Sequence, residues 1–182
     1  MAENLIKCIL NSDEIDKKLN RIATEIAERN MTSGTIALIG IVRRGVPLAN
    51  RLAEKIRKLT DAEILVGSLD ITLYGADHKL LDRFPILNGT DIPFPIEDIP
   101  VILIDDILYT GKTIYKAINA LLDIAEPSEI QLAAFLDRGR RSFPISADYV
   151  GARVPSSSLE RVVLHMNEID GKDEVIIEKR SF

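Results

Sequence analysis

The sequence predicts an α/β protein in which a central, mainly parallel sheet is flanked by helices. Residues 35–41 and 101–104 are apolar at nearly every position, as in strands that are covered on both faces. Helical periodicity follows each of them, and this alternation implies right-handed crossovers between parallel strands. With 182 residues and 46% hydrophobic content, the chain can bury one substantial core, and we expect a single domain over residues 1–182.

The expected elements follow one another in a regular order. A first helix begins at a capping box formed by Asn11 and Glu14 and ends near Arg29. The next helix carries Pro47 in its first turn and an apolar face that extends to Leu59. The remaining elements are strands at 63–72, 101–104 and 130–136 and a helix at 114–124.

Two segments depart from this order. Residues 74–99 lack periodicity and contain several glycines and prolines, a length that is uncommon for an idle loop, so we expect a lid or small hood there. Near the C-terminus, Asp170-Gly171 separates two strand-like segments, which predicts a β-hairpin over about 161–180.

Composition excludes several classes of protein. The single Cys8 cannot form an internal disulfide, and two distant histidines, His78 and His165, do not have metal-ligand spacing, so no protein metal site is predicted. A net charge of −5 argues against indiscriminate binding to nucleic acid, although a local basic patch is compatible with it. No signal peptide or membrane span is apparent, and we expect a cytoplasmic protein without a membrane partner.

The run VILIDDILYTGKT, at 101–113, carries the strongest chemical signal. Asp105 and Asp106 lie where an aliphatic strand should end, which is where open α/β sheets bind ligands. The turn that follows offers free backbone N–H groups, two threonine hydroxyls and a helix start, which suit a phosphate. Carboxylates accept hydrogen bonds from paired hydroxyls or reach a divalent metal through water. A sugar phosphate would fit both parts of this run, with its hydroxyl groups at the carboxylates and its phosphate at the turn.

Three other interpretations of this run are weaker. A Walker A motif needs a glycine at the position of Asp106, and a phospho-receiver domain gathers its acidic pair from several strand ends. A simple helix cap would need only one of the two acids.

The run VILIDDILYTGKTI resembles the phosphoribosyl-diphosphate binding signature of the type I phosphoribosyltransferases. Three more segments, ALIGIVRRGVPLANRLAEKI, GSLDITLYG and FLDRGRRSFPISADYVGARVPSS, resemble in order and spacing the PyrR family of pyrimidine operon attenuators with uracil phosphoribosyltransferase activity. The similarity spans almost the whole chain and implies the type I phosphoribosyltransferase fold.

The resemblance assigns roles to individual residues. Asp105 and Asp106 would hold the ribose hydroxyls, the turn from Tyr109 to Thr113 would wrap the 5′-phosphate, and the loop around Arg43 would take the leaving pyrophosphate. The implied catalytic residues are Asp105, Asp106, Arg44 and Arg138. The implied substrate-binding residues are Val42, Arg43, Arg44, Asp105, Asp106, Leu108, Tyr109, Thr110, Gly111, Lys112, Thr113, Asp137 and Arg138. Asp137 is equally compatible with a structural turn.

The implied reaction joins uracil to ribose 5-phosphate from phosphoribosyl diphosphate (PRPP), giving uridine monophosphate (UMP) and pyrophosphate, with Mg²⁺ bound through the diphosphate. Three departures from the family pattern bear on it: Val42 and Arg43 within the pyrophosphate loop, Gly75 and Ala76 at the start of the lid, and Arg140 in place of a histidine. Tyr74 is a candidate lid hinge. A purine phosphoribosyltransferase of the hypoxanthine type is the alternative enzyme.

The resemblance also implies UMP-dependent binding of a leader mRNA and a homodimer or larger homo-oligomer. Candidate RNA contacts are Arg21, Arg29, Arg141 and Arg153. Acidic residues share the first helix with two of them, which favours an ordinary solvated face equally well. A nucleotide-sensing regulator with little catalytic activity therefore stays open as an alternative.

Overall fold

The computed structural model describes residues 6–72 and 89–179, and its elements follow the predicted alternation. In chain order they are β1 (Ile6–Leu10), α1 (Ser12–Arg29), β2 (Thr35–Ile41), α2 (Gly45–Ile56), β3 (Glu63–Leu69), β4 (Pro100–Leu108), α3 (Lys112–Leu122), β5 (Glu129–Asp137), β6 (Tyr149–Arg153), β7 (Glu160–His165), α4 (Asn167–Asp170) and β8 (Glu174–Lys179).

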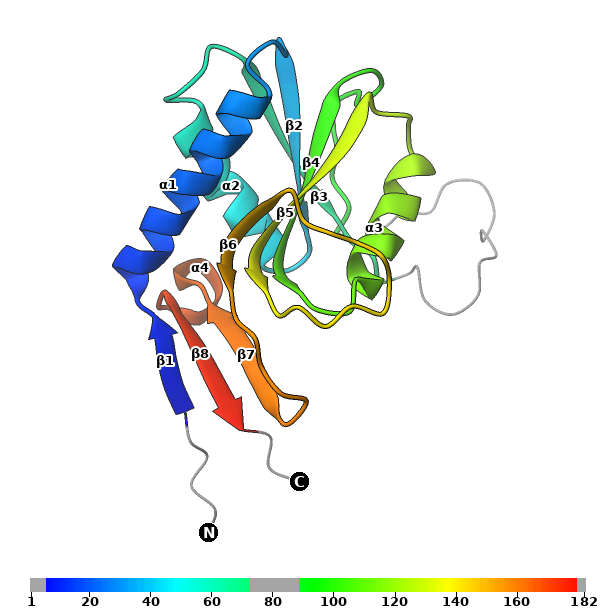
Figure 1. Ribbon diagram of the computed structural model, residues 1–182. Coiled ribbons are helices and arrows are strands. Elements are labelled where there is room, and N and C mark those ends of the chain that lie inside the picture. The colour runs from blue at the N-terminus through cyan, green and yellow to red at the C-terminus, as the bar shows by residue number, and fades with distance from the viewer. Residues whose placement is uncertain (1–5, 73–88, 180–182) are drawn as a thin grey trace.

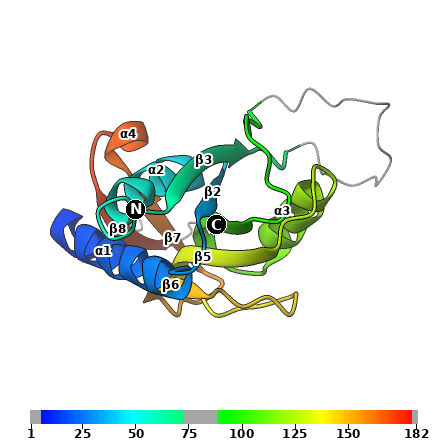
Figure 2. The same cartoon turned by 90° about the horizontal axis from the view of Figure 1, so that it is seen from above.

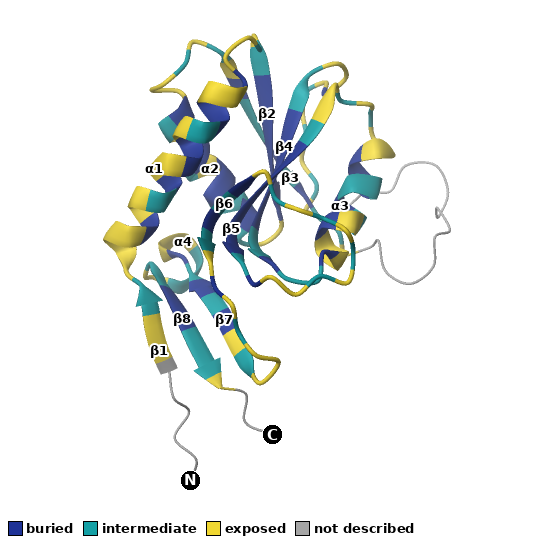
Figure 3. Ribbon diagram, in the orientation of Figure 1, coloured by how far each residue is buried: buried dark blue, intermediate teal, exposed yellow. Residues whose placement is uncertain are grey.

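Five of these strands form the central sheet, in the order β3-β2-β4-β5-β6, and every neighbouring pair is parallel. Helices α1 and α2 cover one face and α3 covers the other (Figures 1 and 2). The predicted class of fold is therefore confirmed. Strands β2 and β4 lie inside the sheet, where helices cover both faces. Both faces of these strands are therefore buried, which explains their unbroken apolar runs (Figure 3).

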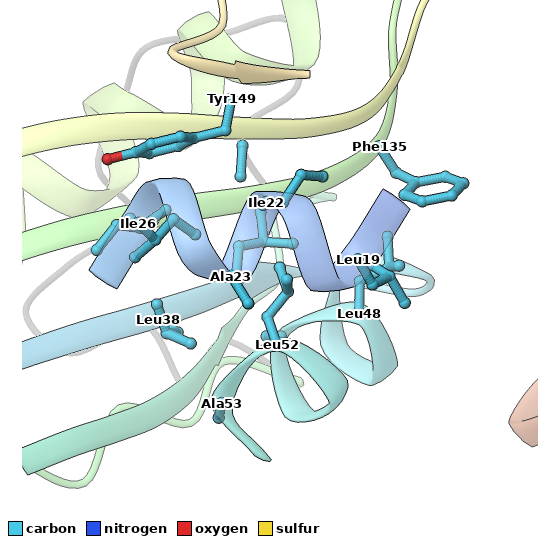
Figure 4. Close-up of a cluster of buried hydrophobic side chains, with 14 of the residues drawn as sticks. Leu19, Ile22, Ala23, Ile26, Leu38, Leu48, Leu52, Ala53, Phe135 and Tyr149 are labelled. Carbon is cyan, nitrogen blue, oxygen red and sulfur yellow. The ribbon is translucent and has the colours of Figure 1, made fainter. Parts of the chain in front are cut away.

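The alternation of side chains along β2 divides the core into two layers. Ile36 and Leu38 pack with α1 and α2, whereas Ala37, Ile39 and Ile41 pack on the α3 side. Figure 4 shows the first layer, in which side chains of α1 interleave with Leu48 and Leu52 of α2 and with Tyr149 of β6. Apolar burial of this kind contributes about 25 cal/mol per Å² to folding, so these two layers hold the sheet and its strand ends in place.

Helix α1 begins where the sequence predicts. The Asn11 side chain accepts a hydrogen bond from the Glu14 N–H at 3.0 Å, and the Glu14 carboxylate accepts the Asn11 N–H at 2.9 Å, so the capping box is complete. The apolar stripe from Ile15 to Ile26 is buried, as its spacing predicts.

Several predicted boundaries are corrected. Helix α2 ends at Ile56, and Leu59 is 53% exposed beyond it. Strand β3 ends at Leu69 and α3 begins at Lys112. The largest change is in β4, which continues to Leu108 and includes both aspartates that the sequence had placed after the strand.

The C-terminal strands pair antiparallel, from Glu160 with Lys179 to His165 with Glu174. The connection between them is longer than a hairpin turn, because β7 ends at His165 and α4 follows it. Strand β1, which was not predicted, adds to the outer edge of β8 and completes a separate three-stranded sheet (Figure 1). Such a short edge strand is stabilised by a partner far along the chain, which local periodicity does not reveal.

Of the expected lid at 74–99, residues 89–99 belong to the described chain, and Asp91 pairs with Ser68 beside β3. Tyr74, Gly75 and Ala76 lie outside the described residues, so the lid stays a prediction. None of the helices in the described ranges combines the length and apolar character that a membrane crossing requires.

Candidate active site

Three predicted segments meet at the carboxyl ends of β2, β4 and β5. These strands are neighbours, with Gly40 of β2 opposite Ile104 of β4, and Leu108 of β4 opposite Asp137 of β5. The loop around Arg43, the turn after Leu108 and the segment after Asp137 therefore share one edge of the sheet. This is where ligands bind in open α/β sheets.

Two glycines bring the arginine loop against the central strand. A Cβ atom at Gly45 would lie 2.3 Å from the Ile104 carbonyl oxygen, and one at Gly40 would lie 2.5 Å from the Gly45 carbonyl oxygen. Only glycine permits this approach, which brings the loop against β4 at Ile104, the residue before Asp105. This requirement was not predicted from the sequence, although the spacing of the two glycines on either side of the loop was its signal.

The loop itself has a distinct backbone path. The Val42–Arg43 peptide is cis, and the Val42 N–H donates to the Leu69 carbonyl at 3.0 Å. Both Val42 and Arg43 are exposed, whereas Arg44 is half-buried and donates to the Asp170 carboxylate at 3.0 Å. Arg43 forms no salt bridge with another described residue.

Burial disfavours the charged form of both carboxyl groups in the pair Asp105 and Asp106. Burial raises the pKa of Asp105 well above its usual value, and the charge of Asp106 raises it further. Burial also raises the pKa of Asp106, and the positive charge of Arg44 opposes that rise. Neither carboxylate forms a salt bridge in the part of the chain that the structure describes. Such a pair is suited to accept ligand hydroxyl groups or a cation.

The turn that follows is shaped for an anion. Gly111 has a left-handed φ of 86° and caps α3, and the first helical hydrogen bond runs from the Tyr115 N–H to the Gly111 carbonyl at 2.9 Å. Helix geometry leaves the N–H groups before Tyr115 without helical acceptors. The Thr110 carbonyl accepts the N–H groups of Ser142 and Phe143, at 2.9 and 3.1 Å, which fixes the turn. Lys112 and Thr113 are exposed beside it.

The side chains of two predicted ligand contacts, Leu108 and Arg138, are held by their own chain, although Arg138 also lines a cavity beside Asp137. The side chain of Leu108 is 1% exposed within the core, so it does not line the site. Arg138 is also buried, and its guanidinium lies 4.1 Å from the centre of the Tyr109 ring. The same guanidinium donates to the Ser156 hydroxyl at 2.7 Å and to the Glu160 carbonyl at 2.9 Å, so it holds the segment before β7 against the phosphate turn.

Asp137 lines a cavity next to this turn. One of its oxygens accepts the Gly139 N–H and the Arg141 guanidinium, both at 2.8 Å. The cavity has a volume of about 730 Å³ and is lined in part by Asp137, Gly139, Arg140, Arg153, Ser156 and Glu160. It is large enough for a planar base and offers both hydrogen-bond acceptors and cationic groups.

Three of the four predicted RNA-contacting arginines bind their own chain. Arg21 donates to the carbonyls of Val150 and Gly151 at 2.6 and 2.8 Å. Arg29 pairs with Asp148 at 2.6 Å and with Glu129, and Arg141 donates to the Tyr109 and Ile145 carbonyls as well as to Asp137. Arg153 is exposed at the cavity without a salt bridge in the described residues.

Comparison with known proteins first defines the class. Residues 7–168 match the family described as "Phosphoribosyl transferase domain". Among solved structures, hypoxanthine phosphoribosyltransferase of Trypanosoma cruzi superposes with a TM-score of 0.74 at 18% identity, over 96% of this chain and 97% of that one. A hypoxanthine-guanine phosphoribosyltransferase of Bacillus anthracis gives 0.71 at 19% identity, over 97% and 99%. At such identity these structures define the fold alone.

Curated relatives define the family within that class. "Bifunctional protein PyrR" of Pelotomaculum thermopropionicum is 48% identical over 169 residues, which are 93% of each chain. The proteins of that name from Acetivibrio thermocellus and Deinococcus radiodurans are 50% and 49% identical, over 93% and 92% of this chain and 92% and 91% of theirs. The chain therefore belongs to the PyrR family of phosphoribosyltransferases, as its motifs predicted.

Proposed function

We propose that the protein transfers ribose 5-phosphate from PRPP to uracil, giving UMP and pyrophosphate. The observation that carries this proposal is the pair of the buried Asp105 and the half-buried Asp106 between an arginine loop and a phosphate turn, in a chain of the PyrR family. In this proposal the carboxylates hold the ribose hydroxyls and the N–H groups of the turn hold the 5′-phosphate.

The reaction needs no nucleophilic side chain. As the glycosidic bond breaks, positive charge develops on the ribose and negative charge on the pyrophosphate, so orientation and electrostatic stabilisation supply most of the acceleration. Arg43 and Arg44 would stabilise the departing pyrophosphate, and the carboxylate pair would stabilise the positively charged ribose. Uracil would enter the cavity beside Asp137. There the Asp137 carboxylate can accept hydrogen bonds from the polar edge of the base, and the neighbouring arginines can donate to it.

Mg²⁺ fits this arrangement as a partner of the substrate. Asp105 is buried and Asp106 is half-buried, and neither forms a salt bridge among the described residues, so the pair of carboxylates suits a hard cation. When bound, the ion would neutralise charge on the leaving group.

A direct assay tests the enzyme. Labelled uracil, PRPP and Mg²⁺ should give labelled UMP, while an excess of hypoxanthine or guanine should not compete. Asp106→Asn should lower kcat/KM by roughly 100-fold or more because the ribose loses a negatively charged acceptor. Asp61→Asn, an exposed acid outside the site, is the matched control. Product from hypoxanthine in place of uracil would establish the purine alternative.

The RNA function is a second proposal, supported by the exposed Arg140 and Arg153 at the mouth of the cavity. We infer that these two arginines contact a leader RNA in the cytoplasm, and that UMP in the neighbouring site changes this contact. In filter binding, Arg153→Gln should weaken binding several-fold, and added salt should weaken binding of the parent protein. Arg21→Gln, whose guanidinium holds β6, should have a smaller effect. If UMP does not change the affinity for RNA, the proposed regulation by UMP is contradicted.

The family also suggests a homodimer or larger homo-oligomer. Sedimentation of the purified protein over a range of concentrations tests this proposal, and a monomer at every concentration would contradict it.

A further inference from the structure

Arg44 is held in place by a residue that belongs to the other sheet. Its Nη2 atom lies 3.0 and 3.2 Å from the two carboxylate oxygens of Asp170, which ends α4 between β7 and β8. The Nε atom of Arg44 is buried and finds no hydrogen-bond partner among the described residues. One side of the guanidinium is therefore fixed by Asp170, and the buried Nε donor is left unpaired among the described residues.

The Asp170 carboxylate is itself fixed by the backbone. One of its oxygens accepts the Met166 N–H at 2.9 Å, which together with Arg44 lowers the pKa of Asp170, so the carboxylate is charged at neutral pH. A charge-assisted hydrogen bond from such an oriented acceptor restricts the rotamers of a long arginine side chain.

The position of α4 does not depend on Arg44. Arg51 of α2 donates to the Glu168 carboxylate at 2.7 and 2.6 Å and to the Asp173 carboxylate at 3.1 and 2.8 Å. Figure 1 places α4 at the end of the three-stranded sheet that faces α2. Arg44 and Arg51 thus both bind the connection between β7 and β8, and the charge of Arg44 also acts on Asp106.

We propose that Asp170 is a positioning residue for pyrophosphate transfer, which orients Arg44 so that its remaining donors meet the diphosphate of PRPP. The inference rests on the proposed function and adds to it a residue that lies outside every segment the family signature pointed to. Asp170 contacts neither substrate in this scheme, and it acts through Arg44.

Direct binding measurements separate this role from general stabilisation. Pyrophosphate and PRPP engage Arg44, whereas UMP occupies the ribose and 5′-phosphate subsites without a diphosphate. Asp170→Ala should weaken pyrophosphate binding about tenfold in calorimetry, because the guanidinium is no longer oriented. It should leave UMP binding within about twofold of the parent. Asp170→Asn, which keeps an oxygen acceptor and folds with less disturbance, should give an intermediate loss.

Asp173→Asn is the matched control. Asp173 also accepts a backbone N–H, that of Asn167 at 2.8 Å, and also pairs with an arginine, but that arginine is Arg51. The Asp173→Asn variant should lower thermal stability as Asp170→Asn does, but its affinity for pyrophosphate should not change. In an Arg44→Gln background, Asp170→Ala should have no further effect on pyrophosphate binding.

The outcomes are distinct. Unchanged or tighter pyrophosphate binding by Asp170→Ala would overturn the inference, and so would an equal loss for UMP and pyrophosphate. If the parent protein binds neither PRPP nor pyrophosphate, the proposed function itself fails.

Discussion

The two segments that begin α2 and α3 occupy equivalent places, yet they are built in different ways. Both follow neighbouring parallel strands at one sheet edge. The segment before α2 presents arginines, and its shape depends on the contact of Gly45 with the Ile104 carbonyl. The segment before α3 presents backbone N–H groups, and its shape depends on the left-handed Gly111. The first segment therefore relies on a close contact between backbones, and the second on a left-handed residue together with the hydrogen bonds that the Thr110 carbonyl accepts.

The largest test of this contrast uses the two glycines. Gly45→Ala should cost roughly 3 kcal/mol of unfolding free energy because its Cβ would meet a backbone oxygen at 2.3 Å that cannot move freely. Gly111→Ala should cost only about 1–2 kcal/mol, from the positive φ. Urea denaturation measures both, and Gly34→Ala, whose Cβ would meet no atom within 4 Å, is the control. A smaller loss at Gly45 than at Gly111 would reverse the comparison.

A second test lies within the phosphate turn. Thr110→Val should weaken PRPP binding about tenfold, because the hydroxyl group is lost from a fixed turn. Lys112→Ala should change it less than about twofold, because the exposed lysine contributes only a solvent-screened charge beside the backbone donors. Calorimetric titration with PRPP gives both values, and the opposite order would assign the lysine a role like that of a Walker motif.

The smallest effect concerns pH. The folded pKa of Asp105 is raised by burial and by Asp106, so its contribution to stability is full below the unfolded pKa and is lost as pH rises through the folded pKa. Asp105→Asn removes this loss and should stabilise the fold by about 1 kcal/mol at pH 8, with little change below the unfolded pKa, at about pH 3. Thermal unfolding of both proteins at the two pH values measures the difference. Equal effects at both pH values would mean that folding does not raise the pKa of Asp105.

Local patterns were sufficient for most of the fold. The capping box at Asn11, the apolar runs of β2 and β4 and the periodicity of the helices each reflect neighbours within a few residues. Strand β1 and helix α4 were missed because β1 is an edge strand whose partner, β8, lies at the other end of the chain, and α4 spans only Asn167–Asp170. The strand prediction stopped before Asp105 because charged residues are rarely buried, and Asp105 is an exception.

The sequence alone determined the class of fold, the phosphate turn and the place of the carboxylate pair, since these depend on residue order within one strand and one turn. Only the tertiary structure decided what each arginine does. Arg44 meets Asp170, and Arg29 meets Asp148, across more than a hundred residues, while Arg138 packs on Tyr109. An arginine has the same formal charge in the sequence whether it faces solvent, a ligand or its own backbone, and only its neighbours in space fix which of these it contacts.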